Sequence, residues 1–179
     1  MRPITAILAL LLLVLPISHA AAQAPAAPRP ADVASVDGII AALYDVISGP
    51  AGQARDWDRF RSLFAPGARL IPAAPRRDSS APVALSPDDY VQRTSDAFLK
   101  SGFFERAVAN QTDAFGTIVH VFSTYESRRA KDDEKPFARG INSIQLMRHA
   151  GRWWIVTVMW DQERPDNPIP AKYLEARLP

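Results

Sequence analysis

The chain has 179 residues, and its 21 Lys and Arg residues nearly balance its 19 Asp and Glu residues, for a formal net charge of +2. The basic residues are scattered singly or in pairs and form no stripe interleaved with aromatic residues, so we expect no nucleic-acid partner. The chain contains no Cys, which excludes a disulfide framework and a lipid-modified cysteine. Its length suits one domain of ordinary size behind a leader.

Residues 1–24 have the parts of a secretory signal peptide. Arg2 supplies a basic start, residues 4–17 are almost entirely apolar, and small residues follow around Ala20, Ala22 and Ala24. The apolar run is too short to span a bilayer comfortably, which favours a cleaved signal peptide over the alternative of an uncleaved membrane anchor. We therefore expect a periplasmic or secreted protein that has no membrane contact after cleavage.

Three amphipathic helices are predicted beyond a linker. Residues 25–35 are rich in Ala and Pro and lack an apolar period, so we expect them to form an extended linker. Apolar residues at three- and four-residue spacing then define each helix. Capping and breaking residues bound the three helices at Ser35 or Asp37 and Gly49-Pro50, at Asp56 and Pro66-Gly67, and at Ser86 and Gly102.

The rest of the chain has the composition of strands and turns. A short strand is predicted at residues 68–71, stopped by Pro72, and a surface loop at residues 73–84. Four longer strands are predicted at residues 103–111, 115–128, 140–148 and 152–163, with a charged hairpin tip at 130–136 and a tight turn at 149–151. Helices followed by a run of antiparallel strands indicate an α+β fold with the helices on one face of a single sheet.

This order of elements resembles the nuclear-transport-factor-like superfamily, which includes SnoaL-like polyketide cyclases and ketosteroid isomerases. Two motifs carry the resemblance: Trp57-x-x-Phe60-x-x-Leu63-Phe64-Ala65-Pro66-Gly67-Ala68 and Gly151-x-Trp153-x-Ile155. The resemblance implies a SnoaL-like domain over residues 36–179, with a curved antiparallel sheet wrapped into a cone around three N-terminal helices. It also implies an apolar pocket at the open end of the cone and a homodimer formed through the outer sheet face.

Membership in this superfamily leaves the chemistry open, because the same scaffold serves many functions. Where ketosteroid isomerases carry a general-base Asp, this sequence has Pro72, which cannot accept a proton. The sequence contains no Gly-rich phosphate loop, no Gly-x-Ser-x-Gly motif and no paired His at metal-binding spacing. We therefore expect neither a cofactor nor a metal site.

Two residues are candidates for catalysis. Tyr44 lies on or beside the apolar stripe of the first predicted helix, and the resemblance implies that its hydroxyl donates a hydrogen bond to a developing oxyanion. The alternative is that its ring packs in the core while the hydroxyl reaches the surface. His120 lies among apolar residues of a predicted strand, where it is either an acid–base group or a hydrogen-bonded core histidine.

Four further residues are candidates for ligand binding. Asn142 is a polar residue on an otherwise apolar strand face that it shares with Ile144 and Leu146. Tyr90 lies on the buried stripe of the third helix, and Trp160 on one face of the last strand. Asp161 ends that strand as an acid at the pocket mouth or as a solvated carboxylate.

Three hypotheses of function follow. The first is an exported protein that binds a small apolar or amphipathic molecule in its cone. The second is a cofactor-free isomerase, dehydratase or cyclase that uses Tyr44 and His120. The third is a non-catalytic, dimer-forming structural module.

The Pro-rich end of the chain also carries a prediction. Pro165, Pro168 and Pro170 forbid a regular helix there, yet Ile169 and Tyr173 are apolar residues that a free tail has little reason to carry. We therefore predict an ordered tail that docks Ile169 and Tyr173 on the domain or on a dimer partner.

Overall fold

The computed structural model describes residues 27–74 and 81–175, so the expected signal peptide lies outside the described residues. The elements follow one another in this order: α1 Pro30–Val33, α2 Val36–Ile47, α3 Trp57–Ser62, β1 Phe64–Pro72, α4 Pro87–Ser101, β2 Phe104–Phe115, β3 Ile118–Arg128, β4 Ala138–His149, β5 Arg152–Gln162 and the short 3-10 helix η1 Ala171–Tyr173. The helices precede the four long strands, which confirms the predicted α+β class.

The sheet has five strands in the order β1-β5-β4-β3-β2 and is mixed. Neighbours from β2 to β5 pair antiparallel, whereas β1 lies parallel to β5. The expectation of a wholly antiparallel sheet is therefore wrong at this edge. Three chain reversals between β2 and β5 fix the direction of β5. The connection from β1 through α4 to β2 leaves β1 next to β5 and parallel to it.

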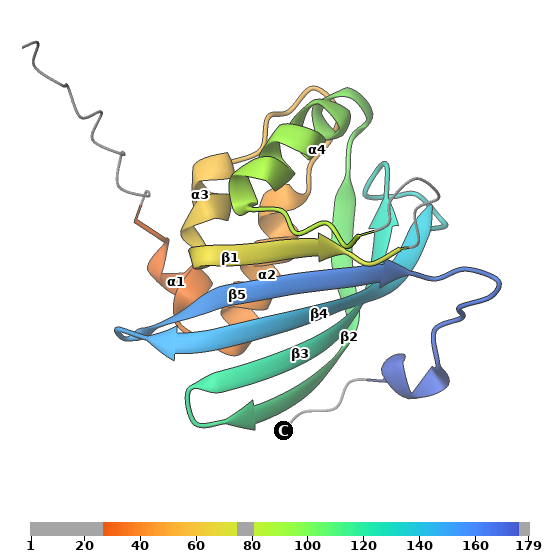
Figure 1. Ribbon diagram of the computed structural model, residues 1–179. Coiled ribbons are helices and arrows are strands. Elements are labelled where there is room, and N and C mark those ends of the chain that lie inside the picture. The colour runs from red at the N-terminus through yellow and green to blue at the C-terminus, as the bar shows by residue number, and fades with distance from the viewer. Residues whose placement is uncertain (1–26, 75–80, 176–179) are drawn as a thin grey trace, which may run out of the picture.

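The core lies between the helices and the concave face of the sheet. Figure 1 shows the sheet curling so that its two edge strands, β1 and β2, flank the helices. Ile39 of α2, Phe60 of α3, Ile144 of β4 and Ile155 of β5 meet there and are fully buried. This enclosed concave face is what positions the candidate site.

The starts of the three predicted helices are confirmed by their caps. The Ser35 side chain accepts a hydrogen bond from the Gly38 amide at 3.0 Å, and Asp56 accepts one from the Arg59 amide at 2.9 Å. Ser86 begins α4 with a complete capping box. The predicted end of α3 at Pro66-Gly67 is wrong, because Phe64 already pairs with Ile155 of β5 and the helix stops at Ser62.

The expected extended linker ends earlier than predicted, because α1 forms within it. Val33 and Asp32 of α1 are buried. The Arg59 guanidinium donates to the two Asp32 carboxylate oxygens over 2.7 and 3.0 Å and lowers the pKa of Asp32. Arg59 stabilises α1 from 27 residues along the chain, so the local sequence pattern does not predict this helix.

The β2–β3 hairpin turns later than predicted. β2 continues to Phe115 and β3 begins at Ile118, so the expected break between residues 111 and 115 is wrong. Gly116 adopts a φ of 58°, which allows the tight turn that it forms with Thr117.

A β-bulge at Val156 changes which side chains of β5 face the core. Leu146 pairs with Ile155 but Gln145 pairs with Thr157, so β5 carries one extra residue between them. Strict alternation would place Ile155 and Val158 on opposite sides of the sheet, yet both are buried in the core. The bulge reverses the alternation, because the extra residue shifts every later side chain to the other face.

The tail beyond β5 is ordered and docks on the outer face of the sheet, as predicted. The Tyr173 ring packs at 4.9 Å from that of Phe122, and its carbonyl accepts a hydrogen bond from the Thr124 hydroxyl at 2.5 Å. The Gln111 side chain donates to the carbonyl of Glu175 at 2.9 Å, and the Ile169 amide donates to Glu163 at 3.1 Å.

Ending the chain at Arg164 should therefore destabilise the domain by about 1–2 kcal/mol and lower its melting midpoint by about 2–8 °C. Differential scanning calorimetry of the truncated and full proteins measures this. Tyr173→Ala, which keeps the chain length, should reproduce part of the loss. Equal midpoints for all three proteins would show that the docked tail contributes nothing to stability.

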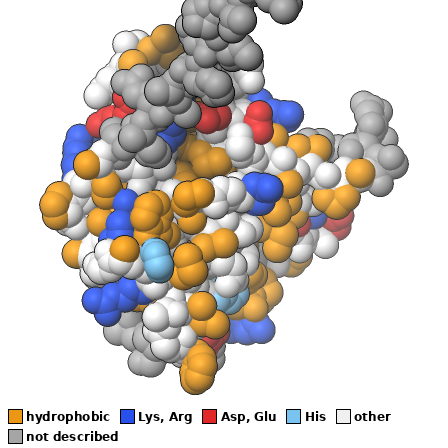
Figure 2. Space-filling view, turned by 60° about the vertical axis from the view of Figure 1, so that its left-hand side comes forward, with side chains coloured by type: hydrophobic (Ala, Val, Ile, Leu, Met, Phe, Trp, Pro, Cys, Tyr) orange, Lys and Arg blue, Asp and Glu red, His pale blue; other side chains and the backbone are white. Residues whose placement is uncertain are grey.

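The part of the outer face beside the two hairpin turns exposes apolar side chains. Phe115, Ile118 and Met147 are 83%, 58% and 37% exposed, and they are cross-strand neighbours at these turns. Figure 2 looks at this side of the molecule and shows hydrophobic side chains among polar ones. The expected homodimer through the outer face stays a prediction. Within the described part of the chain, no helix is long and apolar enough to cross a membrane.

Candidate functional site

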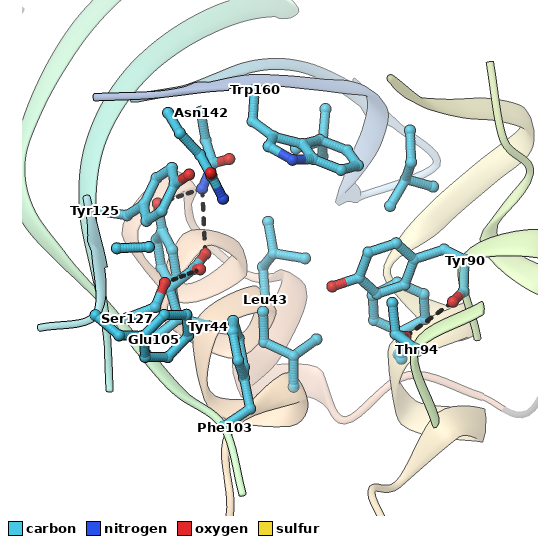
Figure 3. A pocket seen from close by; sticks show the side chains of 17 residues that line it. Leu43, Tyr44, Tyr90, Thr94, Phe103, Glu105, Tyr125, Ser127, Asn142 and Trp160 are labelled. Atoms are coloured by element: carbon cyan, nitrogen blue, oxygen red, sulfur yellow. Dashed lines mark hydrogen bonds between the residues drawn. The ribbon is translucent and has the colours of Figure 1, made fainter. Parts of the chain in front are cut away.

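A cavity of about 220 Å³ lies between the concave sheet face and helices α2 and α4. Its walls are mostly apolar, and seven of its side chains are aromatic: Tyr44, Phe60, Tyr90, Phe103, Tyr125, Phe137 and Trp160. Phe137 is 47% exposed and Gln162 is also exposed, so these two lining residues mark the mouth. Figure 3 shows Tyr44, Glu105, Ser127 and Asn142 gathered at one end of the cavity.

The polar end is a hydrogen-bonded cluster around the Glu105 carboxylate. Ser127 Oγ donates to Glu105 Oε2 at 2.7 Å, and Asn142 Nδ2 lies 3.4 Å from Glu105 Oε1. Asn142 Nδ2 also donates to the Tyr44 hydroxyl at 3.0 Å, and that hydroxyl shares a hydrogen bond of 2.7 Å with Ser123 Oγ. The five side chains form one connected network (Figure 3 draws four of them).

Strand register places these residues together. Glu105 of β2 lies directly opposite Ser127 of β3, and Ser123 of β3 lies opposite Asn142 of β4. Directly opposed residues point to the same face of a sheet, so all four side chains reach the concave side. Tyr44 meets them from α2, which crosses this face.

Burial shifts the pKa values of the groups in this cluster. Burial raises the pKa of Glu105 to about 7, although hydrogen bonds from Ser127 and Asn142 oppose the shift. Burial and the nearby Glu105 carboxylate also raise the pKa of Tyr44 and of Tyr125. Near neutral pH the cavity therefore contains one group that changes charge, Glu105, beside phenols that stay neutral.

The opposite end of the cavity is formed by Tyr90 of α4 and Trp160 of β5. The Tyr90 ring stacks on Phe60 at 5.3 Å and meets the edge of Trp160 at 6.3 Å. In Figure 3 the Tyr90 hydroxyl and the Trp160 indole nitrogen both point toward the cavity. Among the described residues neither group has a hydrogen-bond partner, so both are free to donate to a ligand.

Four of the six residues singled out from the sequence lie around this cavity: Tyr44, Tyr90, Asn142 and Trp160. His120 does not, because β3 turns it to the outer face, where its Nε2 lies 3.0 Å from Ser143 Oγ. The hypothesis that Tyr44 and His120 act on one reacting atom is therefore wrong. Their side chains lie on opposite sides of the sheet.

Asp161 also lies outside the cavity. The bulge at Val156 directs Trp160 inward and therefore Asp161 outward, where its carboxylate accepts hydrogen bonds from Arg164 at 2.5 Å and from the Gln162 amide at 2.8 Å. These contacts lower the pKa of Asp161. Of the two alternatives for Asp161, the acid at the pocket mouth is therefore wrong, and the residue is a strand-end carboxylate paired with Arg164.

Glu105 is the functional candidate that sequence reasoning missed. Its strand was predicted, and within it Phe103, Glu105 and Ala107 share one phase of the alternation. A carboxylate in phase with apolar residues is the signal that points to a buried acid. The described residues contain no group of three or more His, Asp or Glu side chains placed to hold a metal ion.

Comparisons with known proteins place the fold. No protein-family model matches the sequence, and no curated protein is a significant match. Among solved structures, an NTF2-like protein of unknown function from Pseudomonas putida matches with a TM-score of 0.53 at 12% identity, over 70% of this chain and 82% of that one. A proposed ketosteroid isomerase from Parabacteroides distasonis matches with a TM-score of 0.50 at 12% identity, over 72% and 88%.

A protein of unknown function with a cystatin-like fold from Nostoc punctiforme gives a TM-score of 0.54 at 10% identity, over 70% of this chain and 86% of that chain. At these identities the comparisons show the fold alone. The chain has the NTF2-like, ketosteroid-isomerase-like fold, and the cone expected from the resemblance is confirmed. The fold and the cavity together define a pocket-containing α+β domain.

Proposed function

We propose that this protein binds a small, largely apolar molecule with one polar group inside the cone. The observation that carries the proposal is an aromatic and aliphatic cavity that ends in one polar cluster, at Glu105, Asn142 and Tyr44. Apolar walls supply affinity, and a few convergent polar groups orient the ligand. Tyr90 and Trp160 add hydrogen-bond donors at the other end.

The size of the cavity limits the ligand. Its 220 Å³ is below the range of about 300–1,000 Å³ that is usual for drug-sized ligands. A molecule held entirely inside is therefore small, of the order of one ring, and a larger one has to protrude past Phe137. The same argument disfavours a ligand as large as a steroid held entirely inside the cavity.

Thermal shift with a panel of one-ring compounds, such as toluene, phenol and cyclohexanol, tests the proposal. At a hundred times its dissociation constant a ligand adds about 2.7 kcal/mol, which raises the melting midpoint by roughly 5–11 °C. Thr94→Phe should abolish the shift, because Thr94 lines the cavity and a ring there fills it. The matched control Gln92→Phe changes an exposed position of the same helix. No shift with any compound, or equal shifts in both variants, would contradict binding in this cavity.

A second candidate function is a cofactor-free isomerase, dehydratase or cyclase, with Glu105 in place of His120. The observation that favours it is a cavity carboxyl whose pKa lies near 7, since acid–base catalysts work best when their pKa is close to the working pH. Exchange of deuterium from heavy water into small ketones, followed by NMR, tests it. Catalysed exchange that survives in Glu105→Gln would exclude Glu105 as the base.

Export and dimer formation complete the proposal. We expect the mature domain in the periplasm or outside the cell, where it meets its ligand as a homodimer. Cell fractionation and analytical ultracentrifugation test the two statements separately.

A further inference from the structure

Glu105 is partly buried in the cavity wall, and it differs from the buried carboxylates Asp32 and Glu126 in having no cationic partner among the described residues. Asp32 is 7% exposed and pairs with Arg59, and Glu126 is 8% exposed and pairs with Arg106 and Arg128. Among the described residues, Glu105 accepts hydrogen bonds only from the neutral side chains of Ser127 and Asn142. Buried charges are normally paired, so this cavity carries an uncompensated acid.

The described lining of the cavity supplies no positive charge either. No Lys, Arg or His is among the side chains that line it, and Arg106 and Arg128 next to this region are engaged by Glu126. The lining is instead rich in aromatic rings, whose faces attract cations. Three of these rings, Phe103, Tyr44 and Tyr125, lie beside Glu105 in Figure 3.

We propose that the ligand is a small organic cation, an amine or quaternary ammonium compound, whose nitrogen lies between Glu105 and the aromatic rings of the cavity. This inference rests on the proposed function and adds the charge of the ligand to it. The ligand supplies the positive partner that the protein provides for Asp32 and Glu126 but not for Glu105. The hydroxyl of Tyr90 and the indole N–H of Trp160 are then available to a hydrogen-bond acceptor at the far end of the ligand.

Titration of Glu105 makes the proposal measurable. The groups that face its carboxyl are Tyr44 from α2, Tyr90 from α4, Tyr125 and Ser127 from β3 and Asn142 from β4. None of them changes charge near neutral pH, since the pKa values of all three phenols are raised. The neighbouring surface depression that Glu105 also lines carries the charged residues Asp45, Arg106, Arg128, Lys131, Asp132 and Asp133.

Choline and its neutral analogue dimethylbutanol form a matched pair of probes. In dimethylbutanol a carbon atom replaces the charged nitrogen of choline. Isothermal titration calorimetry at about pH 6 and about pH 8 measures both affinities. We expect choline to bind about tenfold more tightly at the higher pH, because the ionised carboxylate is the binding form. Dimethylbutanol has no charge to pair, so its affinity should rise little or not at all.

Two variants complete the experiment. Glu105→Gln should weaken choline at least about tenfold and leave dimethylbutanol nearly unchanged, whereas Asp161→Asn, on the outer face, should leave both affinities as in the wild type. Circular dichroism confirms that each variant is folded.

The proposal is overturned if choline fails to bind, if it binds no better than dimethylbutanol, or if its affinity does not depend on Glu105. In those cases the proposed function stands as long as dimethylbutanol or one of the neutral one-ring compounds binds in the cavity. If the neutral compounds also fail to bind, the proposed function is contradicted together with this proposal.

Discussion

Arg55→Ala should lower the free energy of unfolding by about 3 kcal/mol, with a fall in melting midpoint of roughly 6–12 °C. Arg55 is only 8% exposed, and its guanidinium has no carboxylate partner among the described residues. It donates instead to main-chain carbonyls, at 3.0 Å to Ile47, 2.5 Å to Gly49 and 3.5 Å to Phe98, and also to Gln53. Alanine leaves these buried carbonyls without their donor, which costs more than the hydrogen bonds alone.

The position of these carbonyls explains the size of the effect. Ile47 ends α2, Phe98 lies in the last turn of α4, and Gly49 forms a two-way backbone bridge with Phe103 of the cavity wall. One side chain therefore joins two helix ends to the edge of the sheet. We expect the variant to weaken ligand binding as well, because Phe103 loses part of its support.

Calorimetry of three further variants checks the assignment. Gly49→Ala should destabilise the protein by a similar route, because a Cβ at Gly49 would lie 2.7 Å from the Arg55 Nη1 atom. Arg55→Lys should recover only part of the loss, since one ammonium cannot reach all the carbonyls. Arg61→Ala, which removes exposed ion pairs to Asp58 and Asp88, should cost less than about 1 kcal/mol. A loss in Arg55→Ala no larger than that in Arg61→Ala would refute the argument.

Glu105→Gln should make the protein more stable than the wild type at neutral and alkaline pH, by about 2 kcal/mol. The folded-state pKa of about 7 is above the unfolded value of about 4.3. Between these values the folded wild type holds a proton that the unfolded chain has released, so wild-type stability falls as the pH rises. Above pH 7 the folded protein carries the full cost of the buried charge, which glutamine avoids.

Urea denaturation from about pH 4.5 to about pH 8.5 measures the difference between variant and wild type. The difference should grow with pH up to the folded pKa of Glu105 and then stay constant. Glu126→Gln should instead be less stable than the wild type, because Arg128 and Arg106 lower the pKa of Glu126. The stabilisation by the Glu126 carboxylate is present above its unfolded-state pKa and is lost as the pH falls through its folded-state pKa. A difference for Glu105→Gln that is independent of pH would show that its carboxyl is not buried as described.

Helix starts and most of the element order were predictable because their causes are local. Ser35, Asp56 and Ser86 cap helices with side chains only three residues from the amides they bind. The tail was predictable for a related reason, since Ile169 and Tyr173 are apolar where a free segment is polar. Tyr44, Tyr90, Asn142 and Trp160 were found because polar or amphipathic residues on apolar faces commonly line pockets.

The remaining features depend on contacts that no local pattern contains. α1 requires Arg59 from another helix, and the parallel pairing of β1 follows from the path of the whole chain. His120 was assigned to the site because the sequence does not say which face of β3 is buried. Glu105 itself has a local signal, but its partners Ser127 and Asn142 could not be predicted, because only strand register brings them to it.

The single extra residue at Val156 has a consequence for how the cavity can change over evolution. Deleting Val156 would shift the rest of β5 by one position and exchange its two faces, so that Met159 and Asp161 would enter the cone and Trp160 would leave it. An insertion or deletion there alters the ligand chemistry more than most substitutions at the wall do. Relatives of this chain that differ in length at this point should therefore be compared by register, because an ungapped alignment would equate residues from opposite sides of the sheet.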